Sequence, residues 1–172
     1  FMYEQNGSAF VLGKENVSEH DSLVSLYSKD LGKVLARVTS GAKMNSKLMP
    51  HLQVGSKVAV RLVERKLLRV ADAISFPMKD AKEKLERRLS ALSLLSYLST
   101  DTGVESEVWN YLEKEHWSTT ELLKILGLYA DGVKCFLCRK VEANYFSASD
   151  SEFYCAKCSA RGTAKGLIYY LN

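Results

Sequence analysis

The first 76 residues hold five short runs in which apolar and polar positions alternate. In residues 33–39 apolar side chains fall at every second position with basic ones between them, so one face is apolar and the other partly basic. The expected strands are residues 8–14, 21–28, 33–39, 57–63 and 67–75. Five short strands, with a long connection between the third and the fourth, predict a small, partly open Greek-key barrel of the OB type. The pattern does not separate this barrel from another small one.

After Pro77 the spacing of apolar residues changes to three and four. The expected buried stripe of a first helix, over residues 79–100, is Ala81, Leu85, Leu89, Leu92, Leu95 and Leu98. Two shorter helices should follow, one through His116 and one ending at Gly127. Each opens on a capping box, in which a hydroxyl and a carboxyl group satisfy free backbone N–H groups: Thr102 with Glu105, and Ser118 with Glu121.

The four cysteines of the chain form two C-x-x-C motifs: Cys135, Cys138, Cys155 and Cys158. A two-residue gap lets one tight turn offer two thiolates, and two such turns supply the tetrahedron of soft ligands that Zn²⁺ prefers. We therefore expect a structural zinc ion. Four thiolates leave no open position for water, so a zinc-dependent hydrolase is not indicated.

Two other roles of paired cysteines fit this sequence less well. A disulfide framework is typical of small secreted domains, and this chain shows no apolar leader. A thioredoxin-type redox pair needs only one of the two motifs. Strand-like residues 144–146 and 152–154 predict a small hairpin between the motifs, and apolar residues 167–171 should pack back on it or on the helices.

These elements predict an α+β chain with three parts. We expect an OB-fold DNA-binding domain over residues 1–76, a helical domain over 77–134, and a zinc ribbon with a carboxy-terminal segment over 135–172. At 172 residues and 47% hydrophobic content, the chain can bury one ordinary core and a smaller one. No run of eighteen apolar residues occurs, so we expect no membrane partner.

Positive charge is concentrated in the predicted barrel. The formal net charge is +4, and between residues 31 and 70 nine basic residues face a single acid, Glu64. Such a run is often only a solvated face, but phosphates require positive charge that follows a backbone. The candidate nucleic-acid-binding residues are Lys33, Arg37, Lys43, Lys47, Lys57, Arg61, Arg65, Lys66 and Arg69.

Aromatic side chains that would stack on bases are scarce in the predicted barrel. Tyr27 is the one clear candidate, and it could equally belong to the core. We therefore expect electrostatic binding that is indifferent to base sequence and weakens as salt rises.

No catalytic site is expected. His20, His51 and His116 stand apart at spacings that no metal site uses, and the chain has no nucleophile elbow, phosphate-binding loop or dinucleotide-binding turn. Glu19, His20 and Asp21 are adjacent in sequence, and neighbours in a strand point to opposite faces. The sequence therefore predicts a binding protein.

Several segments together resemble one family: residues 9–12, 18–24, 32–33, 41–43, 46–48, 52–53 and 123–138. In this order they are similar to RecO-type recombination mediators of bacterial gap repair. The chain departs from that family at Ser18, which stands for Gly, at Ser40, which stands for Lys, and at Val54–Gly55, which replace Pro-Phe. Its helical middle, where the family binds a partner's tail, is shorter.

The resemblance implies a barrel that binds single- and double-stranded DNA, annealing of complementary strands, and two protein partners. These partners are the carboxy-terminal tail of the single-strand-binding protein and RecR. We expect a cytoplasmic, nucleoid-associated, non-enzymatic mediator of DNA repair and homologous recombination. The alternative is a zinc-containing interaction adaptor whose basic stripe docks an acidic partner.

Overall fold

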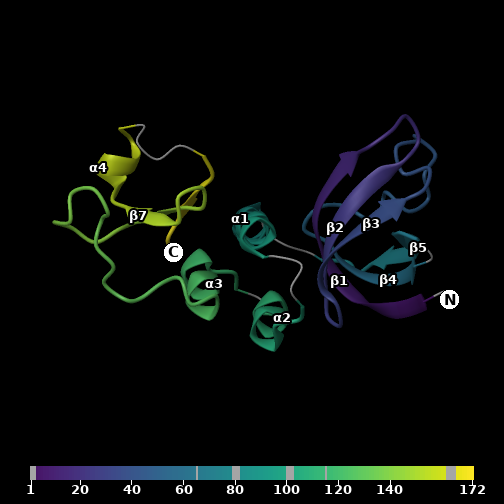
Figure 1. Ribbon diagram of the computed structural model, residues 1–172, viewed down its shortest axis with the longest axis horizontal. Helices are drawn as coiled ribbons and strands as arrows, with labels where there is room; N and C mark the ends of the chain where they lie inside the picture. The colour runs from purple at the N-terminus through teal and green to yellow at the C-terminus, as the bar shows by residue number, and fades with distance from the viewer. Residues whose placement is uncertain (1–2, 65, 79–81, 100–102, 115, 162–165) are drawn as a thin grey trace.

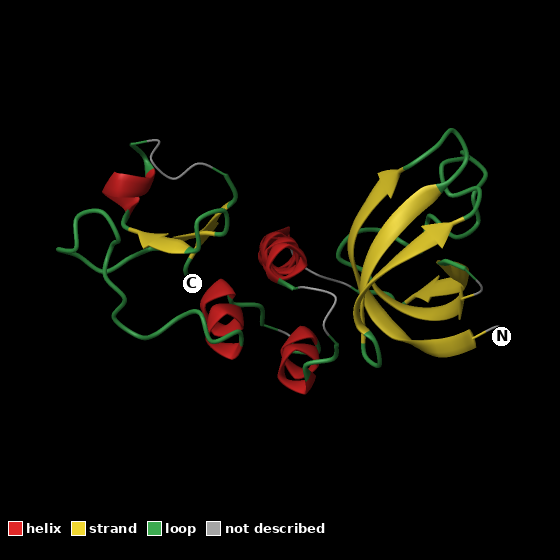
Figure 2. Cartoon of the chain, in the orientation of Figure 1, coloured by secondary structure: helices red, strands yellow, loops and turns green. Residues whose placement is uncertain are grey.

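The computed structural model describes residues 3–64, 66–78, 82–99, 103–114, 116–161 and 166–172. It is elongated, with a barrel at one end, helices in the middle and a small sheet at the other end (Figures 1 and 2). The barrel strands are β1 (Tyr3–Asn16), β2 (Ser22–Ser28), β3 (Gly32–Val38), β4 (Lys57–Glu64) and β5 (Leu68–Ser75). The helices are α1 (Lys82–Leu98), α2 (Ser106–Leu112), α3 (Thr119–Ile125) and α4 (Ala156–Ser159). The strands of the small sheet are β6 (Tyr145–Ser147), β7 (Glu152–Tyr154) and β8 (Ile168–Tyr170).

The barrel is closed, with strand order β1-β2-β3-β5-β4 and β1 paired to both β2 and β4. Only β3 and β5 run parallel among these pairs, and they meet where Arg37 lies opposite Arg69. The alternating apolar positions point inward as expected, and they form a core of their own with Leu52 from the β3–β4 connection. The predicted five-stranded OB-type barrel is confirmed, but it is closed and not partly open, because β1 pairs with both β2 and β4.

Strand β1 is longer than the expected residues 8–14, because it serves two partners. Residues 3–10 pair with β4, and residues 9–16 pair with β2. The register shifts between Val11 and Gly13, and such a bulge bends a strand and increases its twist. The bend lets one strand close the barrel, which the local pattern of side chains did not reveal.

Helix α1 is buried on more than one face. The expected single stripe is wrong at Leu85, which is 38% exposed, whereas Ala91 and Leu94 outside the stripe are fully buried. The reason is that α1 lies between the barrel and the small sheet (Figure 1) and packs against β1 on one side and α3 on another. Ala81, the first stripe residue, lies outside the described part of the chain.

The two expected capping boxes have different outcomes. Ser118 caps α3, because its hydroxyl accepts a hydrogen bond from the backbone N–H of Glu121 at 3.2 Å. Helix α2 instead has Glu105 at its N-cap, without a side-chain hydrogen bond, so the box that was to begin at Thr102 does not start this helix. Thr102 itself lies outside the described residues.

The carboxy-terminal segment packs back on the molecule, as the sequence predicts. Strand β8 pairs with β6, which also pairs with β7 in the expected hairpin. The last residue, Asn172, then reaches the start of α3, where its side-chain oxygen accepts the Thr119 N–H at 2.9 Å. This bond satisfies one of the free backbone donors that every helix start presents.

One hydrophobic core runs through most of the molecule. It joins the outer face of β1 and β2 at Phe10 and Tyr27, the helices α1 to α3, and the small sheet at Phe146 and Tyr169. The barrel interior is a second core. The expected boundary between residues 134 and 135 is therefore crossed by continuous packing, and the division into three domains stays a prediction. No described helix is long and apolar enough to cross a membrane.

Candidate metal centre and nucleic-acid interface

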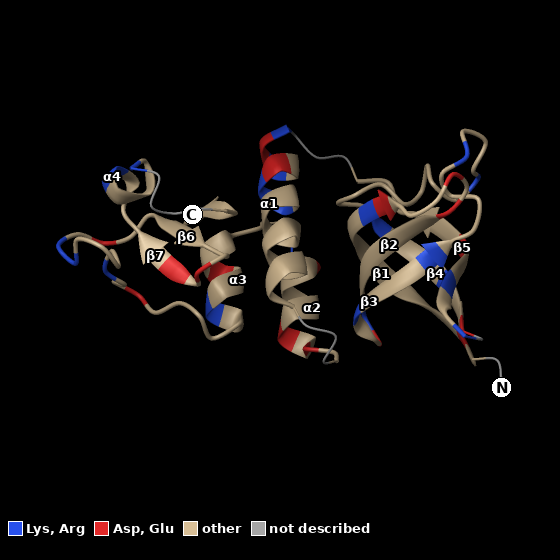
Figure 3. Ribbon diagram, turned by 45° about the horizontal axis from the view of Figure 1, so that its top comes forward, with Lys and Arg blue, Asp and Glu red and all other residues tan. Residues whose placement is uncertain are grey.

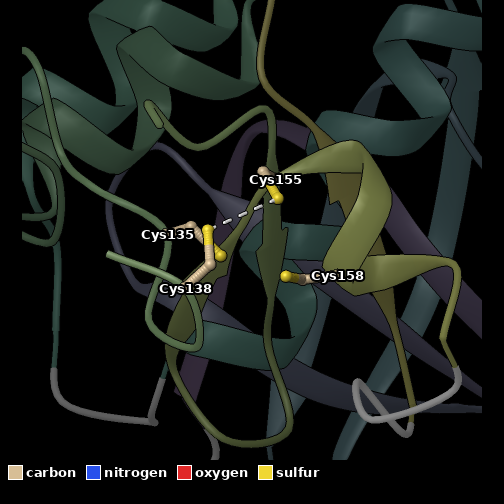
Figure 4. A group of neighbouring side chains, drawn as sticks. All are labelled: Cys135, Cys138, Cys155 and Cys158. Atoms are coloured by element: carbon tan, nitrogen blue, oxygen red, sulfur yellow. Dashed lines mark hydrogen bonds between the residues drawn. The ribbon is translucent and has the colours of Figure 1, made fainter. Parts of the chain in front are cut away.

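The four cysteines meet at one point beside the small sheet (Figure 4). Their sulfur atoms all lie within 4.8 Å of one another, and the Sγ atoms of Cys138 and Cys155 are 4.0 Å apart. A tetrahedral zinc ion with bonds of about 2.3 Å places its sulfur ligands roughly 3.8 Å apart. A disulfide would require about 2.05 Å, and all four cysteines are free. The arrangement fits a four-coordinate metal ion.

Backbone hydrogen bonds shape the two turns that carry these cysteines, which we call the first knuckle (Cys135–Cys138) and the second knuckle (Cys155–Cys158). In the first, Arg139 N–H donates to the Cys135 carbonyl at 2.9 Å. In the second, Ser159 N–H donates to the Cys155 carbonyl at 2.9 Å. Phe136 N–H binds the Phe153 carbonyl at 2.7 Å, which ties the first knuckle to β7 just before the second begins. The knuckles and β6 to β8 form a unit that we call the ribbon.

The ribbon stabilises thiolates before any metal binds. Burial raises the pKa of Cys135, but N–H groups of Cys138, Cys155 and Leu137 outweigh it and bring this pKa to about 6. The N–H of Lys140 lowers the pKa of Cys138 in the same way. By contrast, the pKa of Cys158 is raised because its thiol donates to Cys155, so the cluster cannot ionise fully by itself. A metal cation removes that conflict by deprotonating the remaining thiols.

The nine candidate DNA-binding residues do not share one surface, because two of them face the helices. The Lys33 ammonium group donates to the carbonyls of Ser96 and Ser99, at 2.6 and 3.1 Å, and so occupies the carboxy-terminal end of α1. A cation is favourable there, since the helix dipole concentrates negative potential at that end. The Lys33 ammonium group thus already has two partners within the protein, and its role in phosphate binding stays a prediction.

Lys57 is held at the same junction. Its ammonium group binds the Glu113 carboxylate at 2.7 Å and lies 5.9 Å from the ring centres of Phe10 and Trp109. This ion pair is the leading cause of the lowered pKa of Glu113. Lys57 therefore fastens β4 to α2, and its charge is already compensated.

A second group of cations gathers where β3 and β5 run side by side. Arg37 and Arg69 are direct neighbours across these strands, and Lys66 stands in the turn before β5. A surface hollow of about 490 Å³ lies beside them, lined by Thr39, Val63, Lys66, Arg69, Val70 and Ala71. Two arginines at neighbouring positions repel each other, so an anion that contacts both is favoured at this place.

Asp21 compensates Arg37 in part. Its carboxylate binds Arg37 at 2.5 Å and also accepts the Ser40 N–H at 2.8 Å. These contacts, the Ser40 bond first, hold the pKa of Asp21 below its usual 3.8. The sequence does not predict this pair, because the two residues are sixteen positions apart and only the register of β2 and β3 brings them together.

The remaining cations are spread over other parts of the barrel (Figure 3). Lys43 and Lys47 are exposed on the β3–β4 connection. Arg61 lies on β4, where it pairs with Glu4 at 3.5 Å. Arg65 falls outside the described residues. Tyr27 is only 2% exposed and belongs to the core that the helices share, so its stacking role is not available and the core interpretation holds.

The comparison with known families concerns this barrel. A family model described as the amino-terminal domain of recombination protein O matches residues 2–77. The barrel is therefore similar to the amino-terminal domain of RecO proteins. The match supports a RecO-type protein and a role in DNA recombination and repair, and it ends where the helices begin. A comparison with curated proteins finds no match to this chain.

Proposed function

We propose that this RecO-type chain binds DNA through the surface that β3 and β5 share and acts as a non-enzymatic recombination mediator. The observation that carries the proposal is the pairing of Arg37 with Arg69 beside a hollow that Lys66 also lines. These three side chains offer a row of donors to successive phosphates. The exposed Lys43 and Lys47 extend the positive charge onto the connection that follows β3.

The mechanism is charge neutralisation. Each phosphate that a lysine or arginine contacts releases a condensed counterion, and this release drives binding at moderate salt. A strand held in this way is less repelled by its complement, so annealing of single strands follows from the same contacts. Leu35 is 56% exposed between Lys33 and Arg37, and it gives the bases an apolar surface at the centre of this face.

The remaining expectations belong to this proposal. We propose DNA and proteins of the repair machinery as partners, among them the single-strand-binding protein's tail and RecR, and action in the cytoplasm on the nucleoid. We propose Zn²⁺ as the resident metal, because four cysteine ligands in a closed tetrahedron suit it and leave no place for a substrate. The ribbon then has a structural role and supplies no catalytic step.

A salt titration of DNA binding tests the proposal. We expect Lys66→Glu/Arg69→Glu to weaken binding of oligothymidine at least about tenfold and to make the slope of log affinity against log salt shallower by roughly 1.4, since two phosphate contacts are lost. Fluorescence anisotropy measures both quantities.

The matched control is Lys82→Glu/Lys84→Glu, which makes the same change of charge on the exposed start of α1. Equal losses of affinity for oligothymidine in the two variants would show that the binding surface is not the one that β3 and β5 share. Negligible affinity of the wild-type chain for DNA at every salt concentration would favour the adaptor that docks an acidic protein.

A further inference from the structure

The outer end of the ribbon exposes two apolar side chains among cations. Phe136 and Leu137, between the cysteines of the first knuckle, are 46% and 47% exposed. Four exposed basic residues follow the cysteines of the two knuckles or lie between them: Arg139, Lys140, Lys157 and Arg161. This surface plays no part in the cores that join the ribbon to the helices.

The cysteine cluster determines how these side chains are presented. All four sulfur atoms converge on one point, so the residues between the cysteines lie on the outside of each turn. The ring of Phe136 packs against Tyr154 at a centroid distance of 6.3 Å and an interplanar angle of 78°. Phe136 is thus held in place by the ribbon while nearly half of its surface stays open to solvent.

The four cations of this surface differ in their pairing from the cations of the barrel. Among the described residues, no ion pair involves Arg139, Lys140, Lys157 or Arg161, whereas the barrel pairs Arg37, Lys57 and Arg61 with acids. Asp150 and Glu152 lie at the turn of the β6–β7 hairpin, where the Asp150 carboxylate accepts the Tyr154 hydroxyl at 2.6 Å, and the exposed Glu142 follows Lys140 by two residues. Four thiolates around a divalent metal carry a net charge of −2, so four cations exceed what the centre itself requires.

We propose that the outer end of the ribbon is a second binding surface for single-stranded DNA, in which Phe136 stacks on a base and the four cations hold the adjoining phosphates. A ring beside cations is the combination that binds unpaired strands, because every base has a face to stack on and every linkage has a charge to neutralise. In a duplex the base faces are already stacked on one another, so only the contacts between phosphates and cations contribute to binding. The inference rests on the proposed function, because that function makes single-stranded DNA the ligand. It does not depend on the DNA-binding residues of the barrel.

Substitutions in the metal-loaded full chain test the surface. Phe136→Leu keeps an apolar side chain of similar size and removes the ring, and we expect it to weaken oligothymidine binding about fivefold or more while leaving duplex binding unchanged. Arg139→Glu/Lys140→Glu should weaken binding to both and reduce the single-strand salt slope by roughly 1.4. Lys82→Glu/Lys84→Glu is the matched control for charge.

Metal content is measured on each variant, because the same cations could instead serve only to offset the thiolates. If Arg139→Glu/Lys140→Glu loses its metal, the test depends on Phe136→Leu, because this substitution alters no charge. Unchanged affinity of Phe136→Leu for oligothymidine would overturn the inference. Binding of polyglutamate as tightly as oligothymidine would also overturn it and assign the surface to an acidic protein.

Crosslinking locates the bound strand on the wild-type chain, without any substitution. We expect light-activated 5-iodouracil oligonucleotide to label the tryptic peptide Cys135–Arg139 of the wild-type chain. Labels confined to barrel peptides, with loss of binding only in Lys66→Glu/Arg69→Glu, would overturn the ribbon surface and leave the barrel's function standing. Insensitivity to both sets of variants would overturn both proposals.

Discussion

At the scale of single residues, basic side chains have different roles at different positions of the barrel. Lys33 and Arg37 are four residues apart on β3, yet one closes the end of α1 and the other stands beside Arg69. The sequence pattern correctly placed both on the outer face. It could not separate them, because the difference arises from which outer positions the helices cover.

Asp21 gives a prediction about this face. Asp21→Asn removes one negative charge beside Arg37, so we expect affinity for oligothymidine to rise about two- to fivefold. Asp30→Asn removes the same charge from the turn before β3, away from Arg37, and should leave the affinity near that of the wild type. A rise of equal size in both variants would show that only net charge matters.

The same substitution has a defined pH dependence. The pKa of Asp21 is lowered in the folded protein, so its ionised form contributes stability above the unfolded pKa of about 3.8, and that contribution is lost as pH falls through the folded pKa. We expect wild type to melt above Asp21→Asn at pH 6. The gap should narrow as the pH falls below about 3.8 and through the folded pKa, and a gap that is constant with pH would contradict the role given to the charge.

At the scale of elements, the sequence correctly predicted the features that depend only on neighbouring residues. Strand alternation depends on which side of a strand faces the barrel interior, and the cysteine spacing depends on one turn, so both can be read from neighbouring residues. The buried faces of α1 could not be predicted as one stripe, because burial of Ala91 and Leu94 needs two partners on different sides. The long β1 likewise depends on two partner strands.

The ribbon gives a prediction at this scale. Binding of a metal at a thousand times its dissociation constant stabilises the folded state by about 4 kcal/mol, so chelation should lower the melting temperature by roughly 10 °C. Addition of Zn²⁺ should restore it, and the metal content of natively purified protein should be one per chain. Cys155→Ser should already melt low and respond to neither reagent. A chelator without effect on metal-containing wild type would contradict a structural role.

At the scale of the whole molecule, the shared core makes the barrel and the helices one structure. Phe10 projects from β1 to within 5.6 Å of the rings of Trp109 and Trp117, the two tryptophans of the chain. Tyr27 and Leu12 belong to the same core. The helices therefore bury the part of the barrel's outer face that these residues form.

Phe10 tests this dependence. We expect Phe10→Ala to cost about 3–5 kcal/mol, since the side chain is fully buried, and to shift tryptophan emission to longer wavelength as water reaches both indoles. Thermal transitions followed by tryptophan emission and by circular dichroism should coincide in the wild type. Leu35→Ala, on the open face of β3, should change stability little. Separate transitions in the wild type would show that the barrel and helices unfold independently.

The contacts of Lys33 affect how chemical footprinting of this protein is to be interpreted. An amine reagent will find the Lys33 ammonium group shielded by the Ser96 and Ser99 carbonyls whether or not an oligonucleotide is present, while Lys43 and Lys47 stand open. Low labelling at Lys33 thus reports that the barrel and α1 are still joined. A gain of labelling there would be the signal that the two have come apart.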